Sequence, residues 1–113
     1  MSEIEDALLF QMRALGLPVP VRNHRFMAPE RQFQFDFAWL APVLLAVEIQ
    51  GGSGYKGKGE FSMGHHVRPG GYESDCIKQC EAVLRGWRVL PVTGAMVNDG
   101  RALAYIERAL GRK

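Results

Sequence analysis

The sequence predicts a small α/β domain in which a mixed β-sheet carries helices on its faces. Two runs, 32–39 and 43–50, alternate with the two-residue period of strands and are separated by a segment short enough for a hairpin turn, 40–42. Segments with apolar residues at helical spacing lie before and after this hairpin. The length of 113 residues and the apolar content of 47% fit one compact domain spanning 1–113.

A helix is expected at the start of the chain. Ser2 and Glu5 have the spacing of a capping box, in which Ser2 caps the helix and Glu5 reaches back. Gly16 is expected to end this helix, and a first strand is expected at 23–27. The apolar residues of the helix recur at helical spacing: Ile4, Leu8, Met12 and Leu15.

The hairpin is expected to separate apolar from polar side chains. Alternation places Glu48 and Gln50 on one face of the second run. If the turn centres near Ala41, Asp36 lies opposite Ala46 and diagonal to Glu48, roughly 7–8 Å away at the backbone. Asp36 and Gln34 would share the polar face of the first run. The opposite face would hold the apolar residues Phe33, Phe35, Phe37, Trp39, Leu45, Val47 and Ile49.

The second half of the chain predicts a helix, a strand and a final helix. The strand at 87–92 follows a helix that itself follows a strand, so a right-handed parallel crossover is expected. Asn98 or Asp99 is expected to cap the last helix, with Leu103, Ile106, Ala109 and Leu110 facing inward. The helix at 72–85 would present an apolar face made of Cys76, Ile77, Cys80, Val83, Leu84 and Trp87.

The two cysteines, Cys76 and Cys80, are interpreted as small apolar residues on that buried face. A disulfide between successive turns of one helix has poor geometry, and zinc needs more ligands at matched spacing. No signal peptide or long apolar run is visible, so we expect a cytoplasmic protein without a membrane partner. The glycines at 51–54 do not match a phosphate-binding loop, so no nucleotide cofactor is expected.

Asp36 and Glu48 are the candidate metal ligands. Magnesium takes hard oxygen ligands and keeps several waters, so two carboxylates and the backbone carbonyl of Ile49 suffice to hold it. Such a cation can polarise a phosphodiester and lower the pKa of a bound water. The alternative is a half-solvated hairpin whose outward face is simply polar.

These residues, in their order along the chain, resemble the PD-(D/E)XK nuclease superfamily. The likeness rests on Phe35-Asp36-Phe37, on Val47-Glu48-Ile49-Gln50-Gly51-Gly52, and on Gly86-Trp87-Arg88-Val89-Leu90, with a loop and a helix between the last two segments. It is strongest to small phage and prophage endonucleases of the Holliday junction resolvase-like and virus-type replication-repair branches. It implies a restriction endonuclease-like fold, Mg²⁺ or Mn²⁺ on Asp36 and Glu48, and a place in a bacterial or phage-infected host cell.

One position departs from the family pattern. The superfamily motif usually ends in a lysine that orients or deprotonates the attacking water, and here that position is Gln50. Gln50 can hydrogen-bond a water but cannot act as a cationic acid–base group. Lys78, on the helix after the loop, is the candidate replacement, and its alternative is a solvated helix lysine. The resemblance also suggests Glu5 as an extra metal or water ligand, in competition with its capping role.

A basic, glycine-rich segment is expected to contact DNA. Residues 52–71 are predicted to be a flexible loop whose Lys56, Lys58 and Arg68 make sequence-independent phosphate contacts. His66, and less so its neighbour His65, is a candidate general acid or phosphate contact, with a plain solvated histidine as the alternative. Arg31, before the second strand, either contacts a phosphate or pairs with Glu30.

The sequence thus predicts a DNA endonuclease that depends on Mg²⁺ or Mn²⁺. A chain this small offers little surface for base readout, so we expect selectivity for branched or distorted DNA such as a Holliday junction. Two alternatives remain: a DNA-binding module that kept the fold and lost catalysis, and an unrelated small α/β interaction protein. A homodimer is expected, with a nicking monomer as its alternative, and the apolar candidates for an interface are Phe26, Met27, Leu40 and Met63.

Overall fold

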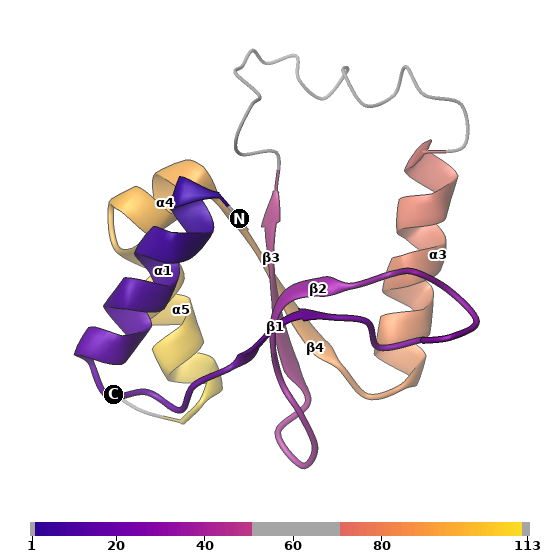
Figure 1. Ribbon diagram of the computed structural model, residues 1–113, viewed down its shortest axis with the longest axis horizontal. Helices are drawn as coiled ribbons and strands as arrows, with labels where there is room; N and C mark the ends of the chain where they lie inside the picture. Colours follow the sequence, from indigo (N-terminus) through magenta and orange to yellow (C-terminus); the bar gives the residue numbers. More distant parts are fainter. Residues whose placement is uncertain (1, 51–70, 112–113) are drawn as a thin grey trace.

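The computed structural model describes residues 2–50 and 71–111. It confirms the predicted class: a small α/β domain with a four-stranded mixed sheet flanked by helices (Figure 1). None of the described helices has the length and apolar character needed to cross a bilayer. In chain order the elements are α1 (Glu3–Ala14), β1 (Val21–His24), β2 (Phe35–Trp39), β3 (Leu45–Gln50), α3 (Gly71–Leu84), β4 (Arg88–Thr93), α4 (Gly94–Asn98) and α5 (Arg101–Ala109).

The strands lie side by side in the order β1-β2-β3-β4. The first two pairs are antiparallel, and β3 and β4 are parallel, with Glu48 opposite Pro91. The parallel pairing confirms the crossover expected from the order strand, helix, strand. It also makes β3 a central strand, whose last residues pair with β4.

Helices cover both faces of the sheet (Figure 1). One face packs against α1, α4 and α5, around a core that includes Leu8, Phe37, Leu45, Val47 and Ile106. The other face packs against α3, around a smaller core of Phe35, Ala38, Ala46, Ala82 and Trp87. The candidate site lies on this second, less populated side.

The hairpin register differs from the expected one by two residues. Ala38, not Asp36, pairs with Ala46. The turn is centred on Pro42 rather than Ala41, and Val43 and Leu44 both donate main-chain hydrogen bonds to the Leu40 carbonyl. An even shift by itself preserves which face each side chain occupies. Continued by two residues, the register places Asp36 level with Glu48 rather than diagonal to it.

The apolar alternation predicted for β2 is wrong at Phe35. Phe37 and Trp39 join the α1 side, but Phe35 belongs to the core on the α3 side. Regular pairing with β3 extends only as far as Phe37. Next to that point the Asp36 side chain accepts the Ile49 N–H, at 2.7 Å. The change of face at Phe35 coincides with this interruption of the ladder.

The helix faces also required correction. Cys76 and Cys80 are exposed, not buried as predicted, and Val83 and Leu84 on the same predicted face are exposed as well. The α3 face that meets the sheet instead carries Ala82, which is 1% exposed. The spacing of apolar residues alone could not identify which face of α3 is buried. A small side chain or a long polar one can pack against the sheet where a larger apolar side chain cannot.

At the other positions the prediction differs from the structure mostly at element boundaries. In α1, Leu8 and Met12 are buried as expected, but Leu15 is 43% exposed. β1 begins two residues earlier than predicted, and a short helix, α4, precedes the last one. Gly100 is the N-cap of α5, and the Asp99 carboxylate accepts the Arg101 N–H.

Candidate functional site

The centre of the site is an ion pair between a strand and a helix. The Lys78 Nζ atom of α3 donates a hydrogen bond to Glu48 Oε2 of β3, at 2.6 Å, and another to the Gln34 carbonyl oxygen, at 2.7 Å. The Lys78 and Glu48 side chains are only 17% and 13% exposed. The interpretation of Lys78 as a solvated helix lysine is therefore wrong.

The local sequence explains why Lys78 reaches this point. Residues four apart share one face of a helix, so Lys78 lies one turn before the buried Ala82 and faces the sheet with it. The small side chain of Ala82 lets the helix approach closely. The aliphatic stem of Lys78 can then cover apolar surface while its head reaches polar partners. Its Nζ also lies 5.5 Å from the centroid of the Phe35 ring.

Asp36 is held beside this pair by the main chain of β3. Its Oδ2 atom accepts the Ile49 N–H, so β2 and β3 are joined by a side chain one residue beyond Glu48. The charge of Asp36 acts on Glu48, and the charge of Lys78 acts on Asp36. The three groups, from β2, β3 and α3, therefore form one electrostatic unit.

Burial dominates the electrostatics of both carboxyls. Desolvation is the largest influence on Asp36 and raises its pKa above the ordinary value, against the opposing hydrogen bond from Ile49. Desolvation likewise raises the pKa of Glu48, although the hydrogen bond from Lys78 opposes it. Neighbouring carboxylates raise the same pKa values further. Glu5 raises the pKa of Asp36, and Asp36 and Asp75 raise the pKa of Glu48. Carboxyls held in this way favour an added positive charge.

Glu5 lies near the site but is engaged elsewhere. Ser2 Oγ accepts the Glu5 N–H at 3.0 Å, which confirms Ser2 as the cap of α1. The Glu5 carboxylate does not complete the box as predicted but pairs with Arg22 of β1, at 3.2 Å. Arg22 also approaches Asp6, and its guanidinium lies 5.6 Å from the centroid of the Phe37 ring.

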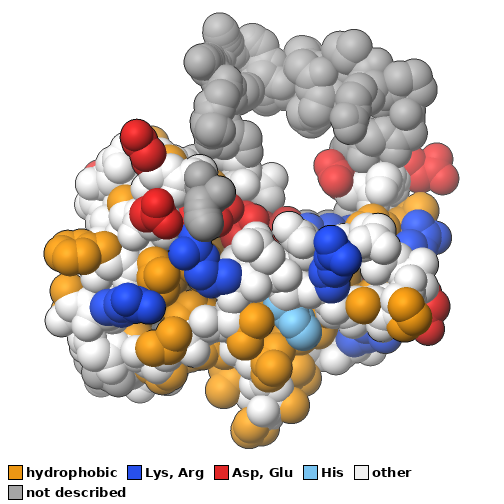
Figure 2. All heavy atoms as spheres, viewed as in Figure 1, with side chains coloured by type: hydrophobic (Ala, Val, Ile, Leu, Met, Phe, Trp, Pro, Cys, Tyr) orange, Lys and Arg blue, Asp and Glu red, His pale blue; other side chains and the backbone are white. Residues whose placement is uncertain are grey.

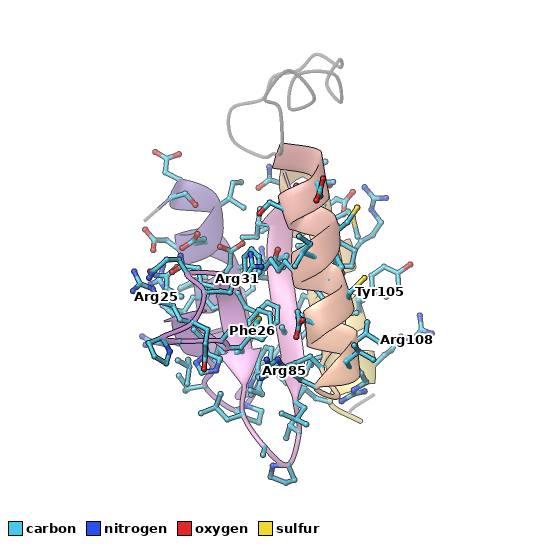
Figure 3. All side chains as sticks on the ribbon, turned by 90° about the vertical axis from the view of Figure 1, so that its right-hand side faces the viewer. Arg25, Phe26, Arg31, Arg85, Tyr105 and Arg108 are labelled. Atoms are coloured by element: carbon cyan, nitrogen blue, oxygen red, sulfur yellow. The ribbon has the colours of Figure 1, made fainter. Side chains whose placement is uncertain are left out.

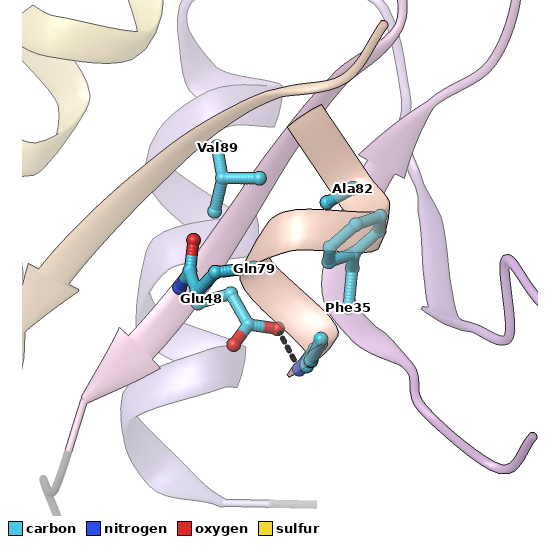
Figure 4. A pocket seen from close by; sticks show the side chains of 6 residues that line it. Phe35, Glu48, Gln79, Ala82 and Val89 are labelled. Atoms are coloured by element: carbon cyan, nitrogen blue, oxygen red, sulfur yellow. Dashed lines mark hydrogen bonds and ion pairs between the residues drawn. The ribbon is translucent and has the colours of Figure 1, made fainter. Parts of the chain in front are cut away.

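The Glu48–Lys78 pair forms part of a shallow recess beneath α3 (Figure 4). Figure 2 shows acidic and basic side chains close together across the upper part of the viewed face. The recess is lined by Phe35, Glu48, Lys78, Gln79, Ala82 and Val89.

Other predicted site residues lie apart from this unit. Gln50 is exposed at the end of β3. Arg31 is exposed, and its guanidinium lies 5.3 Å from the centroid of the Phe33 ring. Met27, proposed for an interface, is buried, whereas Leu40 is 44% exposed. The predicted loop 52–71 lies almost wholly outside the described residues, together with Lys56, Lys58, Met63, His65, His66 and Arg68.

The donor set suits a hard cation with few protein ligands. Asp36 and Glu48 each use one oxygen in the hydrogen bonds above, and a carboxylate has further lone pairs on both oxygens. Within 2–50 and 71–111, no group of three or more His, Cys, Asp and Glu side chains is arranged to hold a metal. Carboxylate oxygens such as those of Asp36 and Glu48 are ligands of the kind that magnesium accepts.

Sequence reasoning missed two partners in this region. The Gln34 carbonyl fixes Lys78, and main-chain acceptors leave no signature in side-chain patterns. Arg22 pairs with Glu5 from 17 positions along the chain. The first strand was predicted to begin at residue 23, after Arg22, so no sequence pattern indicated that contact.

No protein-family model, curated protein or solved structure matched this chain in the comparisons with known proteins.

Proposed function

We propose that this protein is a DNA endonuclease that depends on Mg²⁺ or Mn²⁺ and acts on branched or distorted DNA. The observation that carries the proposal is the meeting of Lys78 with Glu48, beside Asp36. Two carboxylates and a lysine are the groups that the likeness to PD-(D/E)XK nucleases requires. Here the lysine comes from the helix and not from the strand position occupied by Gln50.

The roles follow from the chemistry of each group. Asp36, Glu48 and the Ile49 carbonyl would hold the cation, which when bound would polarise the phosphate and acidify a water. Lys78 holds the Glu48 carboxylate in place and offers a cation to the scissile phosphate. Gln50, at the exposed end of β3, offers an amide that can orient a water by hydrogen bonding.

A catalytically inactive DNA-binding module is the second candidate. The observation that favours it is the same ion pair, because Lys78 can neutralise the charge of the Glu48 carboxylate. Metal binding distinguishes the two functions, since the module needs no cation on these carboxylates.

The nuclease proposal includes a homodimer, because cutting two strands requires two sites and each chain carries one.

The test combines metal binding with cleavage. Calorimetric titration with Mn²⁺ is compared for the wild type, Asp36→Asn, Glu48→Gln and the control Asp99→Asn, whose carboxylate is exposed and pairs with Arg101. The same proteins are incubated with Mg²⁺ or Mn²⁺ and linear, nicked, flap and four-way junction DNA. We expect Mn²⁺ binding and cleavage by the wild type and control, and loss of both in the two site variants.

Each other outcome has a definite meaning. DNA binding without Mn²⁺ binding or cleavage supports the inactive module. Cleavage retained in both folded site variants overturns the site assignment. Absence of Mn²⁺ binding, DNA binding and cleavage in the wild type rules out both functions.

A further inference from the structure

Four aromatic residues form a connected cluster beside the candidate site. The rings of Phe26 and Phe35 are nearly parallel, with centroids 4.3 Å apart and an interplanar angle of 7°. Phe33 continues the stack on Phe26, at 6.5 Å and 21°. At the inner end, the ring of Trp87 lies 5.0 Å from that of Phe35. We call Phe33, Phe26 and Phe35 the aromatic column.

The inner end of this column is tied to the candidate site. Phe35 is 1% exposed, and Lys78, which lies over its ring, makes the 2.6 Å bond to Glu48. The outer end reaches the surface, because Phe26 and Phe33 are only partly buried. Phe26 packs against the α3-side core, but Phe33 belongs to neither of the two cores. Among the described residues, packing against a core therefore accounts for the positions of Phe35 and Phe26 but not for the position of Phe33.

The outer end also carries positive charge. Arg31 lies over the ring of Phe33, at 5.3 Å. Figure 3 shows Arg25 and Arg31 on the same side of the molecule as Phe26, whereas Tyr105 and Arg108 lie on the opposite side. An aromatic or guanidinium plane stacks on an unpaired base, and arginine also binds the adjoining phosphate.

We propose that the Phe33 end of the aromatic column is a stacking platform for one unpaired base of a DNA strand, which takes the place of the Arg31 guanidinium on the Phe33 ring while Arg31 binds the DNA backbone. This inference rests on the proposed function and names its substrate class. DNA with a base outside the duplex, as at a flap, a bulge or the centre of a distorted junction, would be preferred. Fully paired duplex would lack the stacking contact and keep only the phosphate contacts.

The test compares Phe33→Leu with Tyr105→Leu. Tyr105 is the matched control because it lies under Arg108 at 5.6 Å, the same kind of pair, on the far helix α5. Leucine keeps apolar volume, and thermal melting checks that both variants fold. Binding is measured by fluorescence anisotropy with Ca²⁺ and no Mg²⁺ or Mn²⁺, on a duplex with one unpaired base and on the fully paired duplex. The unpaired position carries 2-aminopurine, whose fluorescence falls when it stacks.

We expect Phe33→Leu to weaken binding to the DNA with the unpaired base by about tenfold, a typical loss for one stacked base. Its affinity for paired duplex should change less than twofold, and 2-aminopurine quenching should be lost. Tyr105→Leu should change neither. Arg31→Met should weaken both DNAs, because phosphate contacts do not depend on pairing.

The stacking platform is overturned if Phe33→Leu leaves both affinities unchanged, or weakens paired and unpaired DNA equally. It is also overturned if 2-aminopurine is not quenched by the wild type. These results leave the endonuclease proposal standing when metal-dependent cleavage is present. If the wild type binds no DNA at all, both proposals fail. Cleavage and anisotropy measured together therefore separate failure of the stacking platform alone from failure of both proposals.

Discussion

Replacing Lys78 by methionine should destabilise the protein far more than a typical lysine substitution on a helix surface. Methionine keeps most of the aliphatic stem but removes the ammonium that donates to Glu48 at 2.6 Å and to Gln34 at 2.7 Å. Hydrogen bonds to charged groups contribute about 1.5–3 kcal/mol each, and breaking a buried ion pair costs about 3–5 kcal/mol.

The partial exposure of Glu48 makes the expected loss of stability smaller than these energies. With 13% of the Glu48 side chain exposed, water can solvate part of the unpaired carboxylate. We therefore expect a loss of about 2–4 kcal/mol in the free energy of unfolding at pH 7. The control is Arg85→Met, directly after the same helix, whose pair with Glu81 is 3.4 Å long and exposed. It should lose no more than about 0.5 kcal/mol.

Urea denaturation of Lys78→Met, Glu48→Gln and the double variant measures the coupling between the two side chains. The double variant should recover part of the loss, because it removes the unpaired charge. The pH dependence has a definite sign. Burial already raises the pKa of Glu48, and Lys78 opposes that rise. Without Lys78 the pKa rises further, so the variant should gain stability relative to the wild type as the pH falls through that range. A loss below about 0.5 kcal/mol, or one independent of pH, would refute the reasoning.

The remaining predictions concern Asp36 and a turn glycine. Burial raises the pKa of Asp36 above its ordinary value. Wild-type stability should therefore fall as the pH rises from the ordinary pKa of an aspartate through the raised pKa of Asp36. Asp36→Asn keeps an acceptor for Ile49, so it should be as stable as the wild type or more so at pH 7 in urea melts, with the difference vanishing below about pH 4. A clear destabilisation at pH 7 would contradict this. Gly86 has φ +90°, and an added Cβ would lie 3.3 Å from Leu44 Cδ1. Gly86→Ala should therefore lower the thermal midpoint more than Gly16→Ala, at φ +72° with nothing within 4 Å, and equal shifts would exclude the steric contribution.

The sequence by itself determined the class of fold and the two strands of the hairpin. Period-two alternation identified β2 and β3, and the order strand, helix, strand predicted the parallel pairing of β3 with β4. These features depend on residues that are close in the chain or on general rules of connection, so local patterns specify them. The shift of two residues in the hairpin register changes no face by itself, because side chains alternate with a period of two.

Only the tertiary structure decided which groups meet. Lys78 and Glu48 are 30 positions apart, and their contact depends on the rotation of α3 against the sheet. Spacing favoured the face with Cys76 and Cys80, but the helix packs through the small Ala82 and leaves both cysteines exposed. Phe35 changes sides next to the point where the Asp36 side chain accepts the Ile49 N–H of β3. Packing volume and single long-range hydrogen bonds set these outcomes, and neither has a period that can be recognised along the sequence.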